Sequence, residues 1–282
     1  MHLKKIPHYG RYFILIGSQL LKSYLRKEGP IIVHFGYHKA MTSFFHKVFI
    51  DIAPLLRREY FHAFNNLFKF YEKLASMGSE GILCLNNHPA QTFLLPNYVG
   101  SHIVRDPRDL LVSGYKYHLW SEESWVNIPI SNAMSKKLKI NKYGLHLKQD
   151  ESYRQLLNRV DKDLGYQLEF NWRQPHFTQM QNWDYENPNI IEVKYEDIFQ
   201  NENVWFQKIF KHYGVPDILL DVCLKIVEKH SFKVLQKQGN IGDKKHARIG
   251  SPGQWKEELP GTVAKKLLYK YTPLMTKLNY LE

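Results

Sequence analysis

The sequence predicts an α/β protein of three layers, with helices on both faces of a central parallel sheet of about four to five strands. Four short apolar segments have the length and composition of buried strands: residues 31–33, residues 81–85, a segment that ends at Val104, and residues 190–193. Amphipathic segments with the spacing of helices lie between these strands. Strands that alternate with helices along a chain are typical of a parallel sheet.

A single domain is favoured because the 282 residues contain no internal repeat, low-complexity tract or Ser/Gly linker. Hydrophobic residues make up 44% of the chain, which is enough for a sizeable core. Lysine and arginine exceed aspartate and glutamate by 39 − 27 = 12 charges. This excess suits a polyanionic ligand, and it equally suits nucleic acid or an anionic membrane.

Residues 1–29 are expected to form a helical extension ahead of a domain that spans residues 30–282. Their apolar run, residues 12–16, is too short to cross a bilayer and lacks the features of a signal peptide. A helix packed on the domain and a basic helix on a membrane surface both fit this segment. The two cysteines, Cys84 and Cys223, form no CxxC pair, which favours a reducing compartment. We therefore expect a cytoplasmic protein without a transmembrane segment.

The first strand leads into a turn that is suited to an anion. Gly36 ends the strand, and Lys39, Thr42 and Ser43 follow at the start of an amphipathic helix. The free N–H groups of a first helical turn and the positive end of the helix dipole both favour a phosphate there. The segment is not a Walker A loop, because Lys39 comes three residues before Thr42 rather than directly before a hydroxyl residue. An ordinary turn with a solvated lysine explains this segment alone equally well.

His88 stands just past the second apolar strand, residues 81–85. Ligands of open α/β sheets bind at the carboxyl ends of the parallel strands, so His88 is placed where it could act on a ligand. The chain has 14 histidines, and a turn histidine that caps the strand end is the alternative.

A second anion site is predicted where the next strand ends at Val104. Asp106 is expected to cap a helix whose first residue is Pro107. Arg105 leaves the strand end and can bind a phosphate in bidentate fashion, and Ser113 lies two turns into the helix. Two anion sites at one edge of a parallel sheet suggest a ligand with a phosphate at each end.

Residues 121–188 carry little strand signal and interrupt the alternation of strands and helices. Residues 165–183 are expected to be helical, with a break at Pro175. An insertion of this kind in a strand–helix protein is typical of a lid and a ligand pocket.

These motifs resemble those of the sulfotransferases that use 3′-phosphoadenosine 5′-phosphosulfate (PAPS). Residues 37–44 look like the family's 5′-phosphosulfate loop, and residues 105–115 look like its 3′-phosphate motif. Residues 195–197, after the strand at 190–193, and residues 248–256 also look like stretches of the family. The matches follow the family's order from about residue 31 to residue 255, so the resemblance covers most of the chain.

The resemblance implies a P-loop NTPase-like fold and an enzyme that moves a sulfuryl group from PAPS to a hydroxyl or amine of a small-molecule or glycan acceptor, leaving 3′,5′-ADP. It implies no metal and no nucleic-acid partner, it permits a homodimer, and it makes residues 121–188 the acceptor pocket. His88 would be the general base, Lys39 would stabilise the leaving phosphate, and Ser113 would assist Lys39 and the 3′-phosphate. The residues expected to bind the cofactor are Lys39, Ala40, Met41, Thr42, Ser43, Phe44, Arg105, Ser113, Tyr195, Ser231, Phe232, Arg248, Ile249 and Gly250.

Two positions depart from the family's pattern. Asn86 stands two residues before His88, where relatives often carry a lysine, which leaves Lys39 as the main positive group at the sulfuryl. Ile249 stands where relatives often carry lysine or arginine. Within the same resemblance, Phe44 and Phe232 would sandwich the adenine, because aromatic faces stack well on purines.

Two other classes of protein stay open on the sequence. A P-loop kinase would need Mg²⁺ and an acidic residue after the second strand, where Asn86 and Asn87 stand. A non-catalytic polyanion-binding protein would explain the positive charge but not the ordered motifs at strand ends. Isothermal titration with 3′,5′-ADP, ATP and heparin separates the three classes.

Overall fold

The computed structural model describes residues 29–64, 66–77, 81–87, 95, 97–234 and 250–281. The expected N-terminal extension, apart from Gly29, lies outside the described residues. The chain divides into two compact units. The sheet unit comprises Met1–Val104 and Asp184–Ala247, and the helical unit comprises Arg105–Trp183 and Arg248–Glu282.

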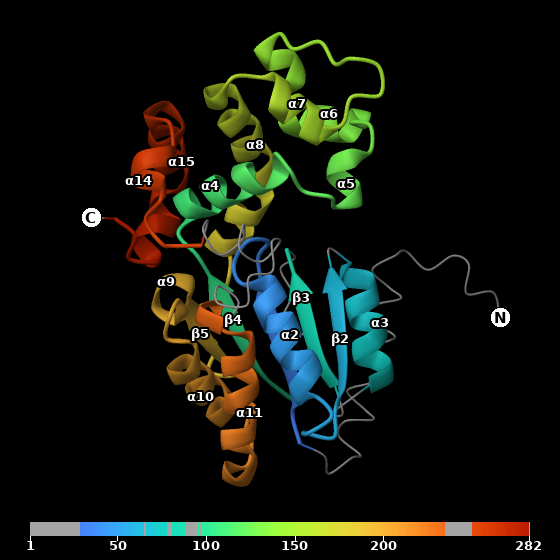
Figure 1. Cartoon of the computed structure of the whole chain (residues 1–282), viewed down its shortest axis with the longest axis vertical. Coiled ribbons are helices and arrows are strands. Elements are labelled where there is room, and N and C mark those ends of the chain that lie inside the picture. The colour runs from blue at the N-terminus through green and yellow to red at the C-terminus, as the bar shows by residue number, and fades with distance from the viewer. Residues whose placement is uncertain are drawn as a thin grey trace, which may run out of the picture. The chain divides into compact units, whose positions relative to one another are not determined.

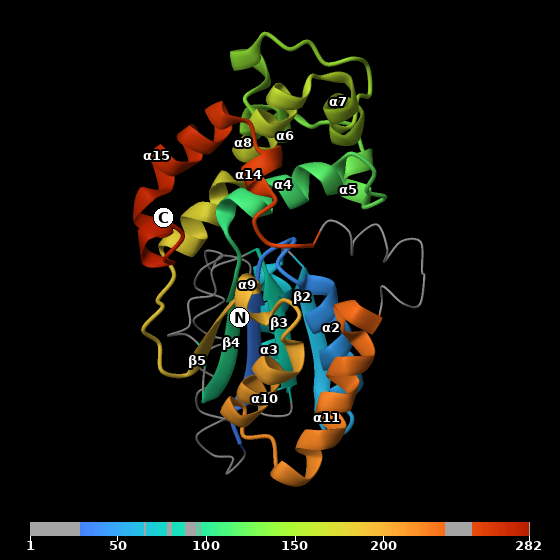
Figure 2. The same ribbon diagram turned by 60° about the vertical axis from the view of Figure 1, so that its left-hand side comes forward.

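Five parallel strands form the sheet in the order β2-β3-β1-β4-β5 (Figures 1 and 2). The predicted α/β fold with a parallel sheet is confirmed, and the structure has a strand at each of the four predicted places. The fifth strand, β2, is the one that the apolar pattern does not locate. The elements of the sheet unit are β1 (Ile31–Gly36), α2 (Thr42–Ile52), β2 (Glu59–Phe64), α3 (Leu67–Met77), β3 (Gly81–Asn86), β4 (Tyr98–Val104), β5 (Ile190–Lys194), α9 (Tyr195–Ile198), α10 (Glu202–His212) and α11 (Asp217–His230).

Helices cover both faces of the sheet. Successive side chains of a strand point to opposite faces, so neighbouring residues of β1 contact helices on different sides. His34 stacks on Phe45 of α2, with ring centroids 4.0 Å apart, and Phe45 in turn contacts Phe206 of α10. Phe35, the next residue of β1, packs against Phe70 of α3 on the opposite face. The predicted three layers are therefore α2 with α10 and α11, the sheet, and α3 (Figure 2).

The central strands bring the candidate site residues to one edge of the sheet. All six residues of β1 and all six of β3 are buried, as expected for strands of a parallel sheet that is covered on both faces. Phe35 of β1 lies opposite Leu85 of β3 and His102 of β4. The carboxyl ends of these strands thus lie side by side, and the segments that follow β1 and β3 carry Lys39 and Asn87.

In the helical unit, α8 contacts α4, α6 and α15. It continues through Pro175, so the predicted break is wrong. Proline removes one backbone hydrogen bond from a helix, and the packing of α8 against three other helices compensates for that loss. The elements of this unit are α4 (Pro107–His118), α5 (Ser124–Asn127), α6 (Asn132–Leu138), the 3₁₀ helix η4 (Ile140–Tyr143), α7 (Tyr153–Arg159), α8 (Lys162–Gln181), α14 (Trp255–Glu258) and α15 (Gly261–Lys277).

Among the described residues, no helix combines the length and the apolar character needed to cross a membrane. The same residues include no group of three or more His, Cys, Asp or Glu side chains that could hold a metal ion. Cys84 and Cys223 are buried free thiols.

Candidate active site

The segment between β1 and α2 forms a tight turn that closes on the carbonyl oxygen of Tyr37. That oxygen accepts hydrogen bonds from the N–H of Ala40 at 2.9 Å and from the hydroxyl of Thr42 at 3.1 Å. Lys39 and Met41 have φ angles of 75° and 58°, in the left-handed region that residues other than glycine rarely adopt. The turn therefore has a strained backbone, and strain of this kind clusters at ligand-binding sites.

The N-terminus of α2 is suited to an anion. Met41 is the N-cap residue, and among the described residues its side chain makes no capping hydrogen bond. By helical geometry, the N–H groups of Thr42 and Ser43 at the start of the helix have no intrahelical acceptor. The first turn reads Thr-Ser-Phe-Phe and so contains no acidic side chain. Together with Lys39, the helix end has the donors and the positive dipole that a phosphate group needs.

Asn87, directly after β3, ties this turn to the neighbouring strand. Its N–H donates to the carbonyl oxygen of Gly36 at 3.0 Å, and its Oδ1 accepts from the N–H of His38 at 2.7 Å. Asn87 and His38 are both buried. The φ angle of Asn87 is 63°, a value that asparagine tolerates better than most residues. The sequence analysis did not predict this supporting role. The signal that could have indicated it is the position of Asn87 at the end of a strand.

Asn86, the last residue of β3, lies beside His62 of β2. The amide Nδ2 of Asn86 donates to Nε2 of His62 at 2.5 Å. Burial, with a smaller contribution from His46, lowers the pKa of His62 to about 4. His62 is therefore neutral at physiological pH and can accept this bond. The predicted general base, His88, follows two residues after Asn86 and lies outside the described residues.

The aromatic residues predicted to bind the nucleotide also belong to the sheet unit. Tyr195 opens α9, and its ring stacks on Phe199 with centroids 5.8 Å apart. Phe232 contacts the same Phe199 ring at 5.1 Å. Phe44 contacts Phe206 of α10 at 5.4 Å. The structure therefore gathers Tyr195 and Phe232 in one cluster, while Phe44 packs in another.

The other predicted residues of this unit are Ala40, which is fully buried in the turn, and Ser231, which is buried just after α11.

In the helical unit, Arg105 is almost fully buried, with 2% of its surface exposed. Its Nη2 donates to the carbonyl oxygen of Gly250 at 3.4 Å, which joins two predicted cofactor-binding residues that are 145 positions apart in the chain. Ser113 is buried on α4. Arg248 and Ile249, which precede Gly250, lie outside the described residues.

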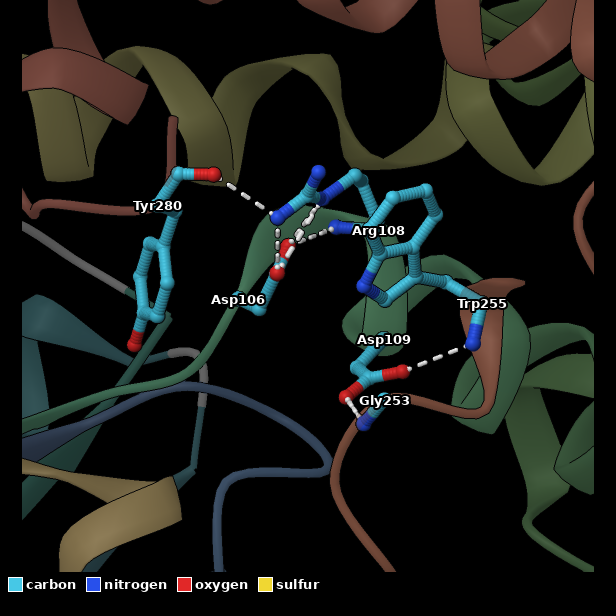
Figure 3. Close-up of polar contacts among 6 residues, drawn as sticks. All are labelled: Asp106, Arg108, Asp109, Gly253, Trp255 and Tyr280. Atoms are coloured by element: carbon cyan, nitrogen blue, oxygen red, sulfur yellow. Dashed lines mark hydrogen bonds and ion pairs between the residues drawn. The ribbon is translucent and has the colours of Figure 1, made fainter. Parts of the chain in front are cut away.

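The helix α4 begins as predicted. Asp106 is its N-cap and accepts from the N–H of Arg108 at 2.8 Å, and Pro107 is the first helical residue. The guanidinium of Arg108 also donates to the Asp106 carboxylate at 2.6 Å and to the carbonyl oxygen of Tyr280 at 2.8 Å (Figure 3). Arg108 therefore links the start of α4 to the segment that follows α15.

Asp109 fixes the stretch that carries the last of the four motifs. Its carboxylate accepts from the N–H of Gly253 at 2.6 Å and from the N–H of Trp255 at 3.0 Å (Figure 3). The guanidinium of Arg108 lies over the Trp255 ring, 3.6 Å from its centre. Gly253 has a φ angle of 84°, which glycine adopts without a steric penalty. Asp109 thus holds the backbone of this stretch, and Arg108 contacts the Trp255 side chain.

Residues 93–279, more than half of the chain, match the family model of the sulfotransferase domain. The chain belongs to this family. The match includes three of the four motifs that carry the resemblance, and it begins after the turn at residues 37–41. The predicted family is therefore confirmed.

Two solved protein structures are similar to this chain. Mouse sulfotransferase SULT7A1 complexed with PAP is 18% identical, with a TM-score of 0.45, and the similarity covers 94% of this chain and 88% of that one. Retinol dehydratase in a complex with retinol and PAP is 13% identical, with a TM-score of 0.42, and the similarity covers 92% and 85%. No curated protein sequence matches the chain.

A buried charge cluster joins α4 of the sulfotransferase domain to α8. The carboxylate of Glu169 accepts hydrogen bonds from Nδ1 of His118 at 2.8 Å, from the hydroxyl of Tyr153 at 2.9 Å and from Nε of Arg173 at 2.7 Å. Burial alone would raise the pKa of Glu169, but the interactions with His118 and Arg173 outweigh it and hold the pKa at about 2. Glu169 is therefore ionised throughout the physiological pH range.

Gly114 of the sulfotransferase domain leaves the space that this cluster occupies. A Cβ atom at Gly114 would lie 2.2 Å from Nη2 of Arg173 and 2.2 Å from Oε1 of Glu169. Ser113 directly precedes Gly114, so the cluster fixes the helical turn that carries Ser113. Sequence reasoning missed the cluster, because its members are spread over three helices.

Proposed function

We propose that this sulfotransferase domain transfers a sulfuryl group from PAPS to a hydroxyl or amine of an acceptor. The observation that carries the proposal is the turn between β1 and α2. It presents Lys39 and a helix N-terminus without a side-chain cap at the carboxyl edge of the sheet, in a chain of the sulfotransferase family.

The residues present fit the two phosphates of PAPS. The N–H groups of Thr42 and Ser43 and the ammonium of Lys39 would hold the 5′ end. Arg105, Ser113 and Arg248 would hold the 3′-phosphate, since guanidinium groups bind phosphate in bidentate fashion. When bound, PAPS supplies the activated sulfuryl group. The other predicted contacts, from Tyr195, Ser231 and Phe232, would lie on the adenine side.

Three side chains have catalytic roles in this proposal. His88 would accept the proton of the acceptor hydroxyl. Lys39 and the N–H groups of the turn would stabilise negative charge on the 5′-phosphate. Ser113 assists Lys39 and the 3′-phosphate. Asn86 cannot supply a second positive charge, so Lys39 carries most of this stabilisation.

The acceptor is bound, in this proposal, by residues 121–188, which belong to the helical unit up to Trp183 and to the sheet unit from Asp184. The buried free thiols of Cys84 and Cys223 fit a reducing compartment, and we place the enzyme in the cytoplasm. A screen of hydroxyl and amine acceptors with PAPS as the donor tests the reaction. Intact-mass spectrometry should show a gain of one SO₃ group on the acceptor, and no gain on any acceptor with purified active protein would contradict the proposal.

The 3′-phosphate site predicts a preference between nucleotides. The protein should bind 3′,5′-ADP about ten- to a hundredfold more tightly than 5′-AMP, because charge-assisted hydrogen bonds contribute about 1.5–3 kcal/mol. Arg105→Ala should erase most of this preference, and Arg105→Lys should keep part of it, since lysine retains the charge but not the bidentate geometry. Isothermal titration measures all three affinities. Lys225→Ala, which removes an exposed charge from α11, is the control and should leave the preference intact. Equal affinity of the wild type for the two nucleotides would remove the basis of the site.

Lys39 should act on the rate rather than on binding. Lys39→Ala should lower kcat by about a hundredfold or more, as the loss of one oxyanion donor does, because the contact strengthens in the transition state. Binding of 3′,5′-ADP, which lacks the sulfuryl group, should change much less. Steady-state kinetics with PAPS and titration with 3′,5′-ADP separate the two effects. A rise in the KM for PAPS at unchanged kcat would make Lys39 a binding residue only.

A further inference from the structure

Three side chains from neighbouring strands form a hydrogen-bonded chain beneath the turn that follows β1. His102 of β4 lies opposite Glu192 of β5 in the register of the sheet. Nδ1 of His102 and Oε2 of Glu192 are 2.7 Å apart, and Nε2 of His102 is 3.4 Å from the hydroxyl of Tyr37. Tyr37 is the first residue after β1, so the chain runs from the sheet into the turn.

The direction of the hydrogen bonds follows from the carboxylate. A carboxylate can only accept, so Nδ1 of His102 donates to Glu192, and in the neutral imidazole Nε2 accepts from the hydroxyl of Tyr37. His102 and Tyr37 are buried, with 1% and 4% of their surfaces exposed. Burial, with smaller contributions from Tyr185 and Glu192, raises the pKa of Tyr37 well above its ordinary value. Tyr37 therefore keeps its proton, and its hydroxyl donates a hydrogen bond to Nε2 of His102.

Tyr37 is also the residue on which the turn closes. Its carbonyl oxygen accepts from both the N–H of Ala40 and the hydroxyl of Thr42. The ring of Tyr37 meets the ring of His102 edge-on, with centroids 5.6 Å apart. A change in the position of Tyr37 would therefore shift the acceptor that shapes the turn, and with it Lys39 and the start of α2.

We propose that Glu192 and His102 are positioning residues of the donor site, which act through Tyr37 to hold residues 37–41 in the shape that binds the 5′-phosphate end of the donor. This inference rests on the proposed function. It adds two residues from β4 and β5, strands that do not carry the turn, and assigns to each a role in donor binding.

Tyr37→Phe tests the inference with the smallest change, because it removes the hydroxyl and keeps the ring. Titration with 3′,5′-ADP and with 3′-AMP isolates the 5′-phosphate, which 3′-AMP lacks. Tyr37→Phe should lower the ratio of the two affinities by roughly three- to tenfold, the range expected for one hydrogen bond, and should leave the affinity for 3′-AMP unchanged. Glu192→Gln should lower the ratio in the same direction. The double variant should lower it no further, because both substitutions break one chain of contacts.

Tyr213→Phe is the matched control. Its hydroxyl is buried in the same unit and bonds the Ser101 hydroxyl at 2.6 Å, and Ser101 lies opposite His34, three residues before Tyr37. Tyr213→Phe should lower the Tm by an amount similar to that of Tyr37→Phe and leave the affinity ratio unchanged. An equal effect of the two tyrosine variants on the ratio, or no effect of Tyr37→Phe, would overturn the inference. A wild type that binds 3′,5′-ADP no better than 3′-AMP would overturn the 5′-phosphate site of the proposed function and the inference with it.

Discussion

Glu169→Gln should lower the free energy of unfolding by roughly 3–5 kcal/mol at neutral pH, as the removal of one partner from a buried ion pair does. The side chains of Glu169, His118 and Arg173 are all fully buried. The amide of glutamine has no charge to balance Arg173, which would stay ionised in an apolar surrounding. Denaturant unfolding followed by tryptophan fluorescence measures the change, since Trp172 packs edge-on against His118 at 5.2 Å.

Glu258→Gln is the control for this substitution. Glu258 is one-third exposed and pairs with Lys116 and Lys162. Ion pairs at the surface contribute about 0–1 kcal/mol, so this variant should stay close to the wild type. Similar decreases in the free energy of unfolding for Glu169→Gln and Glu258→Gln would show that the buried cluster contributes no more to stability than a surface ion pair.

The stability difference between the wild type and Glu169→Gln should depend on pH. The folded protein holds the pKa of Glu169 at about 2, below its ordinary value of 4.5. A carboxyl group with a lowered pKa contributes stability that is fully present above about 4.5 and is lost as the pH falls toward 2. The advantage of the wild type should therefore shrink between these two values. A difference that stays constant across this range would assign the effect of the substitution to packing rather than to charge.

The central part of the fold was predictable because local patterns determine it. β1 and β3 are buried along their whole length, so an apolar run is enough to locate them. β2 lies at the edge of the sheet and mixes Glu59 and His62 with aromatic residues, so its pattern does not mark a buried strand. Pro175 led to the prediction of a break that does not occur, because contacts with distant helices stabilise α8 on both sides of this proline.

In the candidate site, too, contacts between neighbouring residues were predictable and contacts between distant residues were not. The turn after β1 and the cap of α4 depend on residues that are adjacent in the chain, and both follow from residue type and spacing. The supporting contacts join residues far apart: His102 is 90 positions from Glu192 and 65 from Tyr37. A single sequence holds no information on which distant polar residues meet. For this reason the sequence could suggest phosphate-binding groups but did not predict the distant residues that contact the turn.

His88→Ala should nearly abolish transfer to a hydroxyl acceptor, with a loss of about 10²–10⁴ in kcat, because a positioned general base contributes that much. Binding of 3′,5′-ADP should stay close to that of the wild type, since the base contacts the acceptor and not the nucleotide. His88→Gln should be equally inactive, because an amide can donate and accept hydrogen bonds but cannot take up a proton. Steady-state assays and isothermal titration on the same preparations compare the two properties.

The pH dependence distinguishes a base from a binding residue. Only the neutral imidazole can accept a proton, so the rate of the wild type should rise with pH through the range near 6.5 where histidine ordinarily titrates. His212→Ala, at the C-terminal end of α10, is the control and should keep both the rate and its pH profile. The acceptor must be a hydroxyl compound, because an amine that is already neutral needs no base. If both His88 variants kept most of their activity, the base would have to lie within residues 121–188, where His146 and the buried His176 would be the next to replace.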